Sequence, residues 1–184
     1  MSFFKKFSPP KAKMELKLEE AAYNYTDKLT GRIILDPQEE ISVNEIRLEF
    51  GGSRKVRWKK GFSSLNTTSS LETKKIPIGG PVKLQKEQHY EQPFQVNIPP
   101  YSRPDLFTET ELTVKGIIAV QGRPDITHEI KLGITFPYVI ECLRQYGGCG
   151  FITQPLPTPI LTCPACGKNL EEMWNQKYSD EAKS

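Results

Sequence analysis

Apolar and polar residues alternate along most of the chain, from about residue 13 to residue 141. Residues 14–18, 46–50 and 94–98 show the pattern most clearly. A period of two puts successive side chains on opposite faces, as in half-buried antiparallel strands. The same pattern predicts further strands at residues 31–35, 55–58, 71–77, 82–84, 112–120 and 127–140.

Turn-forming residues separate the predicted strands. They are Asp36-Pro37, Gly51-Gly52, Gly79-Gly80-Pro81, Pro99-Pro100 and Gly122-Arg123-Pro124-Asp125. We also expect a loop in the stretch rich in serine and threonine that follows Lys60. Short strands at this spacing, with no amphipathic helix among them, predict an all-β fold, an antiparallel immunoglobulin-like sandwich.

Only the C-terminal region has the pattern of a helix. Over residues 169–178, one side of a helix would carry Leu170, Met173, Trp174 and Lys177, and Trp174 could pack on the region before it. We therefore predict a sandwich over residues 11–140 and a small module over residues 141–178. Residues 1–10 and 179–184 are expected to be flexible termini.

All four cysteines of the chain lie in the predicted small module: Cys142, Cys149, Cys163 and Cys166. Cys163-Pro164-Ala165-Cys166-Gly167 has the two-residue spacing of a zinc knuckle. Six residues separate Cys142 from Cys149, more than a zinc ribbon usually has, but three nearby glycines allow a tight path. Thirteen residues lie between the two pairs, close to the spacing expected in a ribbon. The prediction is one structural Zn²⁺ held by four thiolates.

Three other uses of these cysteines fit less well. Disulfides suit a secreted chain, but Met1–Phe7 lacks the apolar core of a signal peptide, so a reducing cytoplasmic setting is expected. A redox Cys-x-x-Cys normally opens a helix after a strand, whereas Cys163 follows a proline-rich loop. A catalytic zinc usually has a histidine or carboxylate ligand, and His89 and His128 are remote in sequence from the cysteines.

Composition adds little to these predictions. The net charge is only +3 and the pI is about 8.6, below the values of about 9 or more that indicate nucleic-acid binding. No stretch is as long and apolar as a membrane span. No phosphate-binding loop or nucleophile motif accompanies the two histidines, which we interpret as surface or strand residues, so we expect no enzymatic activity.

Four parts of the chain, taken in order, carry recognisable patterns. Residues 25–35 have a tyrosine, an acidic residue and a glycine before a strand, and residues 41–52 with 55–58 have a strand pair ending in arginine-tryptophan. Residues 90–99 have an aromatic-x-x-Pro-Phe strand that closes on a proline. In this order the segments resemble the N-terminal sandwich of the arrestin fold, and residues 1–7 are similar to the opening of its sporulation-control relatives. The resemblance covers about residues 11–140. Arrestins carry a second sandwich, which the cysteine module replaces here.

The resemblance implies an adaptor or scaffold that binds protein partners in trafficking or signalling, such as acidic or phosphorylated segments or tails of membrane proteins. A candidate partner-binding set is Arg54, Lys55, Arg57, Lys59, Lys60, Lys74 and Lys75. If Lys55, Arg57 and Lys59 alternate on one strand, they share a face that attracts anions. The alternative is a solvated strand face that keeps a sheet edge from aggregating, and it is slightly favoured over a specific binding site.

Two alternatives to the adaptor stay open. A zinc ribbon with a basic strand can also bind nucleic acid, and such binding would weaken steeply with salt. Redox sensing through Cys163 and Cys166 would require freely reactive thiols. In addition, the phenylalanines and lysines of residues 3–7 would allow weak contact with an anionic membrane surface.

Overall fold

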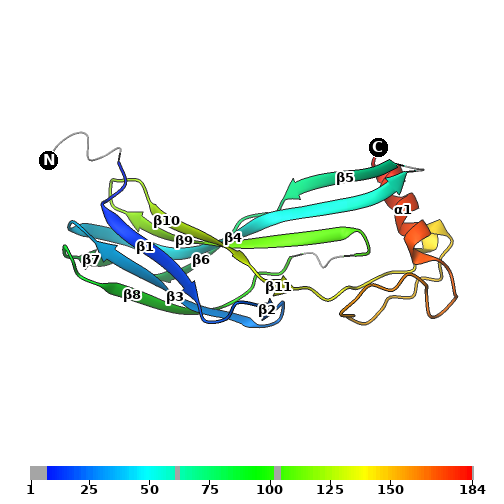
Figure 1. The fold of residues 1–184 in the computed structure, drawn as a ribbon, viewed down its shortest axis with the longest axis horizontal. Coiled ribbons are helices and arrows are strands. Elements are labelled where there is room, and N and C mark those ends of the chain that lie inside the picture. Colours follow the sequence, from blue (N-terminus) through cyan, green and yellow to red (C-terminus); the bar gives the residue numbers. More distant parts are fainter. Residues whose placement is uncertain (1–7, 61–62, 102–104, 184) are drawn as a thin grey trace. The chain divides into compact units, whose positions relative to one another are not determined.

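The computed structural model describes residues 8–60, 63–101 and 105–183. Its elements are β1 (Ala12–Leu18), β2 (Tyr23–Asn24), β3 (Lys28–Pro37), β4 (Ile41–Lys60), β5 (Ser63–Ser70), β6 (Lys74–Gly79), β7 (Val82–Leu84), β8 (Tyr90–Asn97), β9 (Thr108–Val120), β10 (Ile126–Leu132), β11 (Ile134–Thr135), the 3-10 helix η2 (Arg144–Tyr146) and α1 (Leu170–Glu181) (Figure 1). They form two compact units. The first unit comprises residues 1–52, 72–99 and 112–134, and the second unit residues 53–71, 100–111 and 135–184.

The first unit is built from antiparallel sheets. One sheet has the order β1-β3-β8, in which Leu16 pairs with Ile33 and Gly31 with Phe94. The other sheet has the order β10-β9-β4, and β6 and β7 also pair with β4. Strands β2 and β11 add a two-stranded sheet. Figure 1 shows β1, β3 and β8 side by side in one layer.

Alternating apolar residues form the core of the first unit. On β3, Leu29, Ile33 and Leu35 are completely buried, and on β4 Ile46, Leu48 and Phe50 are completely buried. The close approach of the sheets is visible at Gly116 on β9, where a Cβ atom would lie 2.8 Å from Met14 Cε and 3.1 Å from Ile33 Cδ1. A larger side chain at this position would push the two layers apart. The predicted all-β antiparallel sandwich is confirmed.

Two of the predicted turns and loops are instead parts of strands. The chain does not turn at Gly51-Gly52, because β4 runs without a break from Ile41 to Lys60. Gly52 has φ of 140°, which a glycine adopts without strain, so the strand can pass through this point. The serine- and threonine-rich stretch is also not a loop. It is β5, which pairs with β4 from Ser53↔Ser70 to Lys60↔Ser63.

The prediction of one long strand over residues 127–140 is also wrong. Strand β10 ends at Leu132, and only the two-residue β11 and isolated bridges at Tyr138 and Glu141 follow. Gly133 explains the break, since a Cβ atom there would lie 2.8 Å from the carbonyl oxygen of Ala21. The close backbone approach fits glycine and interrupts the ladder.

The second unit contains the β4–β5 hairpin, residues 141–169 with the four cysteines, which we call the cysteine region, and α1. Helix α1 begins at Leu170, close to the prediction, but it continues to Glu181, so Ser179 is helical rather than frayed. The division of the chain into two units groups residues 53–71 and 100–111 with the cysteine region, and the boundary predicted at residues 140–141 stays a prediction.

Within the described part of the chain, no helix has the length and apolar character needed to cross a membrane. The predicted membrane contact of residues 3–7 lies outside the described residues.

Candidate metal centre

The loop between Cys142 and Cys149 is a closed turn. It contains η2, which ends at Gly147 in the left-handed conformation, with φ of 81°. The backbone N–H of Gly148 donates to the carbonyl oxygen of Leu143 at 2.8 Å. A Cβ atom at Gly148 would lie only 2.6 Å from the carbonyl carbon and oxygen of Cys142. The 3-10 turn and these glycines take up the extra residues of the six-residue spacing and bring the two sulfurs to one side.

The second pair lies on a tighter hairpin that leads directly into α1. The N–H of Gly167 donates to the carbonyl oxygen of Cys163 at 2.8 Å, and the N–H of Cys163 to that of Lys168 at 2.9 Å. Asn169 follows Lys168 directly, and its side chain accepts a hydrogen bond from the N–H of Glu172 and caps the helix. The knuckle and the helix are therefore one continuous structure.

All four cysteine sulfurs come together. They lie within 4.8 Å of one another, with Cys142 Sγ 3.6 Å from Cys166 Sγ and Cys149 Sγ 3.7 Å from Cys163 Sγ. Four thiolates around a tetrahedral ion at about 2.3 Å would have sulfur–sulfur edges of about 3.8 Å. Disulfides require about 2.05 Å, and all four cysteines are free. The predicted ligand residues thus form a cluster with the dimensions of a metal site.

The environment of the sulfurs also suits a cation. Burial raises the pKa of the Cys142 thiol to about 12, even though its sulfur accepts from the N–H of Cys149 at 3.3 Å. The backbone N–H of Lys168 lowers the pKa of Cys166 to about 7. Four crowded thiols cannot all ionise without a compensating positive charge, and a metal ion supplies it while releasing their protons.

The cysteine cluster borders the apolar core of the second unit. Cys142 and Cys163 are each 1% exposed, whereas Cys149 and Cys166 are exposed. The buried members of this core are Trp58, Ile140, Cys142, Leu143, Cys163, Leu170, Met173, Trp174 and Tyr178. The ring of Tyr178 lies 6.1 Å from that of Trp58 and 6.0 Å from that of Trp174. The predicted packing of Trp174 against the cysteine region is confirmed.

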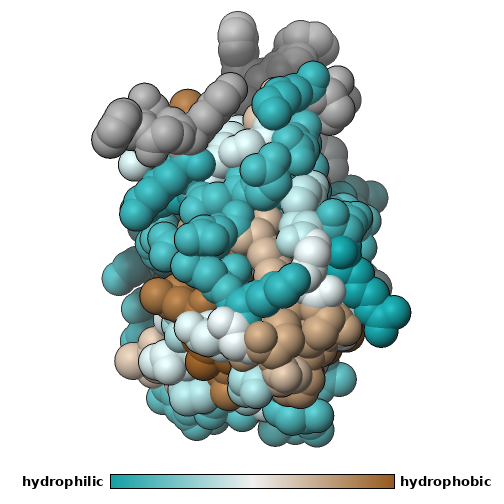
Figure 2. All heavy atoms as spheres, turned by 90° about the vertical axis from the view of Figure 1, so that its right-hand side faces the viewer, coloured by the Kyte–Doolittle hydropathy of each residue, from teal (hydrophilic) through white to brown (hydrophobic). Residues whose placement is uncertain are grey.

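The cysteine region exposes three large hydrophobic side chains. Phe151 is 39% exposed, Ile152 57% and Leu161 54%, and all three belong to this region. Figure 2 shows hydrophobic residues gathered in the lower half of the face it displays, where Figure 1 places the loops of the cysteine region.

The basic residues do not form a single row. Lys55, Arg57 and Lys59 alternate with Arg54, Val56 and Trp58 along β4, and Trp58 is buried on the opposite face. Arg54 shares that opposite face. Its guanidinium donates to Asp105 Oδ2 at 3.5 Å and to Thr108 Oγ1 at 3.3 Å. Lys60 ends β4, while Lys74 and Lys75 lie on β6 in the first unit.

Several of these cations already have acidic neighbours. The ion pairs are Arg57–Glu109 at 3.0 Å, Lys59–Glu171 at 3.7 Å, Lys74–Glu72 at 2.6 Å and Lys75–Glu49 at 3.6 Å. The paired side chains of Arg57 and Glu109 are both more than half exposed. Exposed pairs of this kind contribute at most about 1 kcal/mol each, so an anionic partner could replace the acidic residue. A binding role for these cations stays a prediction.

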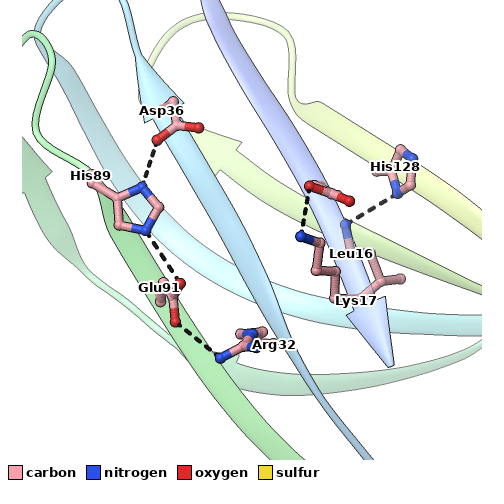
Figure 3. Close-up of polar contacts among 8 residues, drawn as sticks. Leu16, Lys17, Arg32, Asp36, His89, Glu91 and His128 are labelled. Carbon is pink, nitrogen blue, oxygen red and sulfur yellow. Dashed lines mark hydrogen bonds and ion pairs between the residues drawn. The ribbon is translucent and has the colours of Figure 1, made fainter. Parts of the chain in front are cut away.

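Both histidines belong to the first unit. Figure 3 shows their polar contacts. His89 Nδ1 lies 2.6 Å from Asp36 Oδ1, and its Nε2 lies 3.2 Å from Glu91 Oε1. On β10, Nδ1 of His128 accepts a hydrogen bond from the backbone N–H of Leu16 at 3.1 Å and so links β10 to β1. Neither ring belongs to the metal centre, and the interpretation of both as strand or surface residues agrees with these positions.

Sequence reasoning missed Asp105, the buried polar centre of the second unit. Its carboxylate accepts hydrogen bonds from the N–H of Phe107 at 3.0 Å, from Thr108 Oγ1 at 2.8 Å and from the hydroxyl of Tyr178. The Asp-x-x-Thr spacing is the local signal for such a turn. The contact with Tyr178, 73 residues away, has no local signal.

Comparison with known proteins supports the fold alone. No protein-family model matches the chain, and no curated protein sequence matches it. Among solved structures, the chain is similar to Spo0M, a sporulation control protein from Bacillus subtilis, with a TM-score of 0.50 and 18% identity. The match covers 67% of this chain and 49% of that one, so this chain spans about half the length of the Spo0M chain. The arrestin-like fold that the sequence resembles is therefore supported by a distant structural likeness.

Proposed function

We propose that this chain is a non-enzymatic adaptor in which a structural zinc ion organises the cysteine region. The observation that carries the zinc assignment is the group of four sulfurs within 4.8 Å of one another. Thiolate sulfur is a soft ligand that selects zinc over magnesium, calcium and manganese. A tetrahedral set of four thiolates is the usual closed site of structural zinc.

The donor set favours a structural role over a catalytic one. A catalytic zinc keeps one position open for water or substrate. Here all four members of the group are cysteines, and two of them, Cys142 and Cys163, are 1% exposed within an apolar core. A zinc ion at this place would fix the loops on which α1 and the apolar side chains of the second unit pack.

The adaptor role rests on the fold and on the cationic face of β4. Lys55, Arg57 and Lys59 lie on one face of a strand that pairs with β5, which forms the end of its sheet. An edge strand can add an extended peptide through backbone hydrogen bonds, while the adjacent cations select an acidic sequence. An acidic or phosphorylated segment of a protein, such as the tail of a membrane protein, is the partner that this combination fits.

The first experiment measures zinc in the purified chain by elemental analysis. We expect one zinc ion per chain and thiols that react slowly with a thiol reagent until the metal is removed. A chain that contains no transition metal when prepared without chelator would contradict the zinc assignment, and rapidly reactive Cys163 and Cys166 would instead support redox sensing.

The second experiment captures partners by crosslinking and affinity purification, with three matched baits. They are the wild type, a variant with Lys55→Glu, Arg57→Glu and Lys59→Glu, and a control with Lys13→Glu, Lys28→Glu and Lys86→Glu. The control makes the same change in net charge at exposed positions of the first unit. Protein partners should be lost with the first variant alone. Retention of nucleic acid at low salt that falls steeply with added salt would favour the nucleic-acid alternative.

A further inference from the structure

A cavity of about 390 Å³ lies within the second unit and is lined by residues of β4, β5 and α1. The lining residues of β4 and β5 share one face of the hairpin, because Val56 pairs with Thr67 and Arg54 with Ser69. Tyr178 belongs to the wall that α1 contributes. The volume of the cavity is in the range that small ligands occupy in proteins.

Two buried N–H donors on residues that line this cavity have no hydrogen-bond acceptor among the described residues. They are Nε of Arg54 and Nε1 of Trp58. Trp58 is 6% exposed, and the centre of its ring lies 6.1 Å from that of Tyr178. Because nearly all buried donors in folded proteins have an acceptor, we expect an acceptor that does not belong to the chain.

The charged groups at the cavity are already balanced. Nη2 of Arg54 lies 3.5 Å from Oδ2 of Asp105, and Nζ of Lys177 lies 3.9 Å from Oε1 of Glu181. The ammonium group of Lys177 also lies 4.4 Å from the centre of the Trp174 ring. A carboxylate or phosphate in the cavity would bring a further negative charge near two acidic side chains, and like charges in one site repel. An uncharged carbonyl oxygen is therefore the acceptor that fits.

The cavity also offers acceptors and apolar surface. The carboxylate of Glu181 and the hydroxyl oxygens of Thr67 and Ser69 are acceptors for an N–H group, and Val56 and the ring of Tyr178 supply apolar walls. A carboxamide carries both a carbonyl oxygen and N–H donors. From the two unpartnered N–H groups and the balanced charges, we propose that this cavity binds a small uncharged carboxamide with an aromatic or other apolar body.

The experiment titrates the full chain with nicotinamide, a soluble and uncharged aromatic carboxamide, and follows the indole N–H signals by NMR. The chain has two tryptophans, and Trp58→Phe assigns their signals. We expect the Trp58 signal to move and to saturate with a dissociation constant of about 1 mM or below. The Trp174 signal should stay in place, because its N–H already donates to the carbonyl oxygen of Glu141.

Two comparisons test the chemistry and the place of binding. Nicotinate has the same ring with a carboxylate, and we expect it to bind at least about fivefold more weakly than nicotinamide. Thr67→Leu fills the cavity from β5 and should weaken nicotinamide binding at least about tenfold. Thr68→Leu adds the same bulk at an exposed position on the opposite face of β5 and should leave binding unchanged.

A Trp58 signal that does not move at any nicotinamide concentration would overturn the proposal and leave water as the acceptor of the two N–H groups. Nicotinate that binds as tightly as nicotinamide would overturn the assignment of an uncharged ligand. Undiminished binding to Thr67→Leu, or equal shifts of both indole signals, would show that the probe binds elsewhere on the chain.

Discussion

The indole nitrogen of Trp174 donates a hydrogen bond to the backbone carbonyl oxygen of Glu141, 3.0 Å away. Glu141 immediately precedes the first cysteine, and Trp174 lies on α1, which directly follows the second pair. The bond therefore joins the two halves of the metal centre through the helix rather than through the metal. Removal of either the metal or this bond should loosen the cysteine region, and the two effects can be separated.

Trp174→Phe tests the contribution of this bond. The variant keeps an aromatic ring in the core but removes the donor, so we expect a loss of about 1 kcal/mol in the free energy of unfolding of the second unit. Trp58→Phe is the matched control, because the buried Nε1 of Trp58 has no hydrogen-bond partner among the described residues. Its replacement should cost less than that of Trp174, since no bond is lost. Urea titration measures both, and an equal or larger cost for Trp58→Phe would contradict the assignment.

Cys163→Ser should release the metal and unfold the cysteine region while the first unit stays folded. A serine hydroxyl is a poor zinc ligand, and folding of a small metal module is coupled to metal binding. Both tryptophans of the chain, Trp58 and Trp174, belong to the second unit, so tryptophan fluorescence reports on that unit alone. We expect altered fluorescence together with unchanged hydrogen-exchange protection in β3 and in the part of β9 from residue 112 to residue 120. Thr158→Ser, in the loop between the pairs, is the control, and unchanged zinc content in Cys163→Ser would exclude this cysteine as a ligand.

The ligand set could be predicted from the sequence because the chain has only four cysteines and they lie close together along it. Four cysteines in one short region leave few arrangements, and the glycines beside Cys149 show how the long spacing closes. Strand β5 could not be recognised from the sequence. Ser63–Ser70 is exposed along most of its length and therefore has no alternation of apolar residues. Only its pairing with β4 makes it a strand. The continuity of β4 was missed for a related reason. Gly51-Gly52 is a turn signal, and the pairing of neighbouring strands overrides it.

His89 should titrate above its ordinary value of 6.5. Hydrogen bonds to the carboxylates of Asp36 and Glu91 raise the pKa of His89, and Glu91 is in turn paired with Arg32 at 3.5 Å (Figure 3). Since the folded-state pKa is raised, the stabilisation is complete below the unfolded value and is lost as pH rises through the folded value. NMR titration of the ring Cε1–H measures the midpoint. His89→Gln should remove this part of the pH dependence of stability, and a midpoint at or below 6.5 would contradict the contacts.

Tyr178→Phe should destabilise the second unit more than the loss of an ordinary surface hydrogen bond would. The hydroxyl of Tyr178 donates to the carboxylate of Asp105, which is 6% exposed, and burial raises the pKa of Tyr178. A hydrogen bond to a charged group contributes about 1.5–3 kcal/mol, and its removal leaves a buried carboxylate with one donor fewer. Tyr146→Phe serves as the control, since Tyr146 lies in η2 and is only partly buried. Urea unfolding followed by tryptophan fluorescence should show the larger loss for Tyr178→Phe.

The zinc content of both variants should match the wild type, because the Tyr178 hydroxyl stabilises α1 through Asp105 and not through the sulfurs. Equal stability of the two variants would mean that the ring of Tyr178, and not its hydroxyl, holds the helix in place.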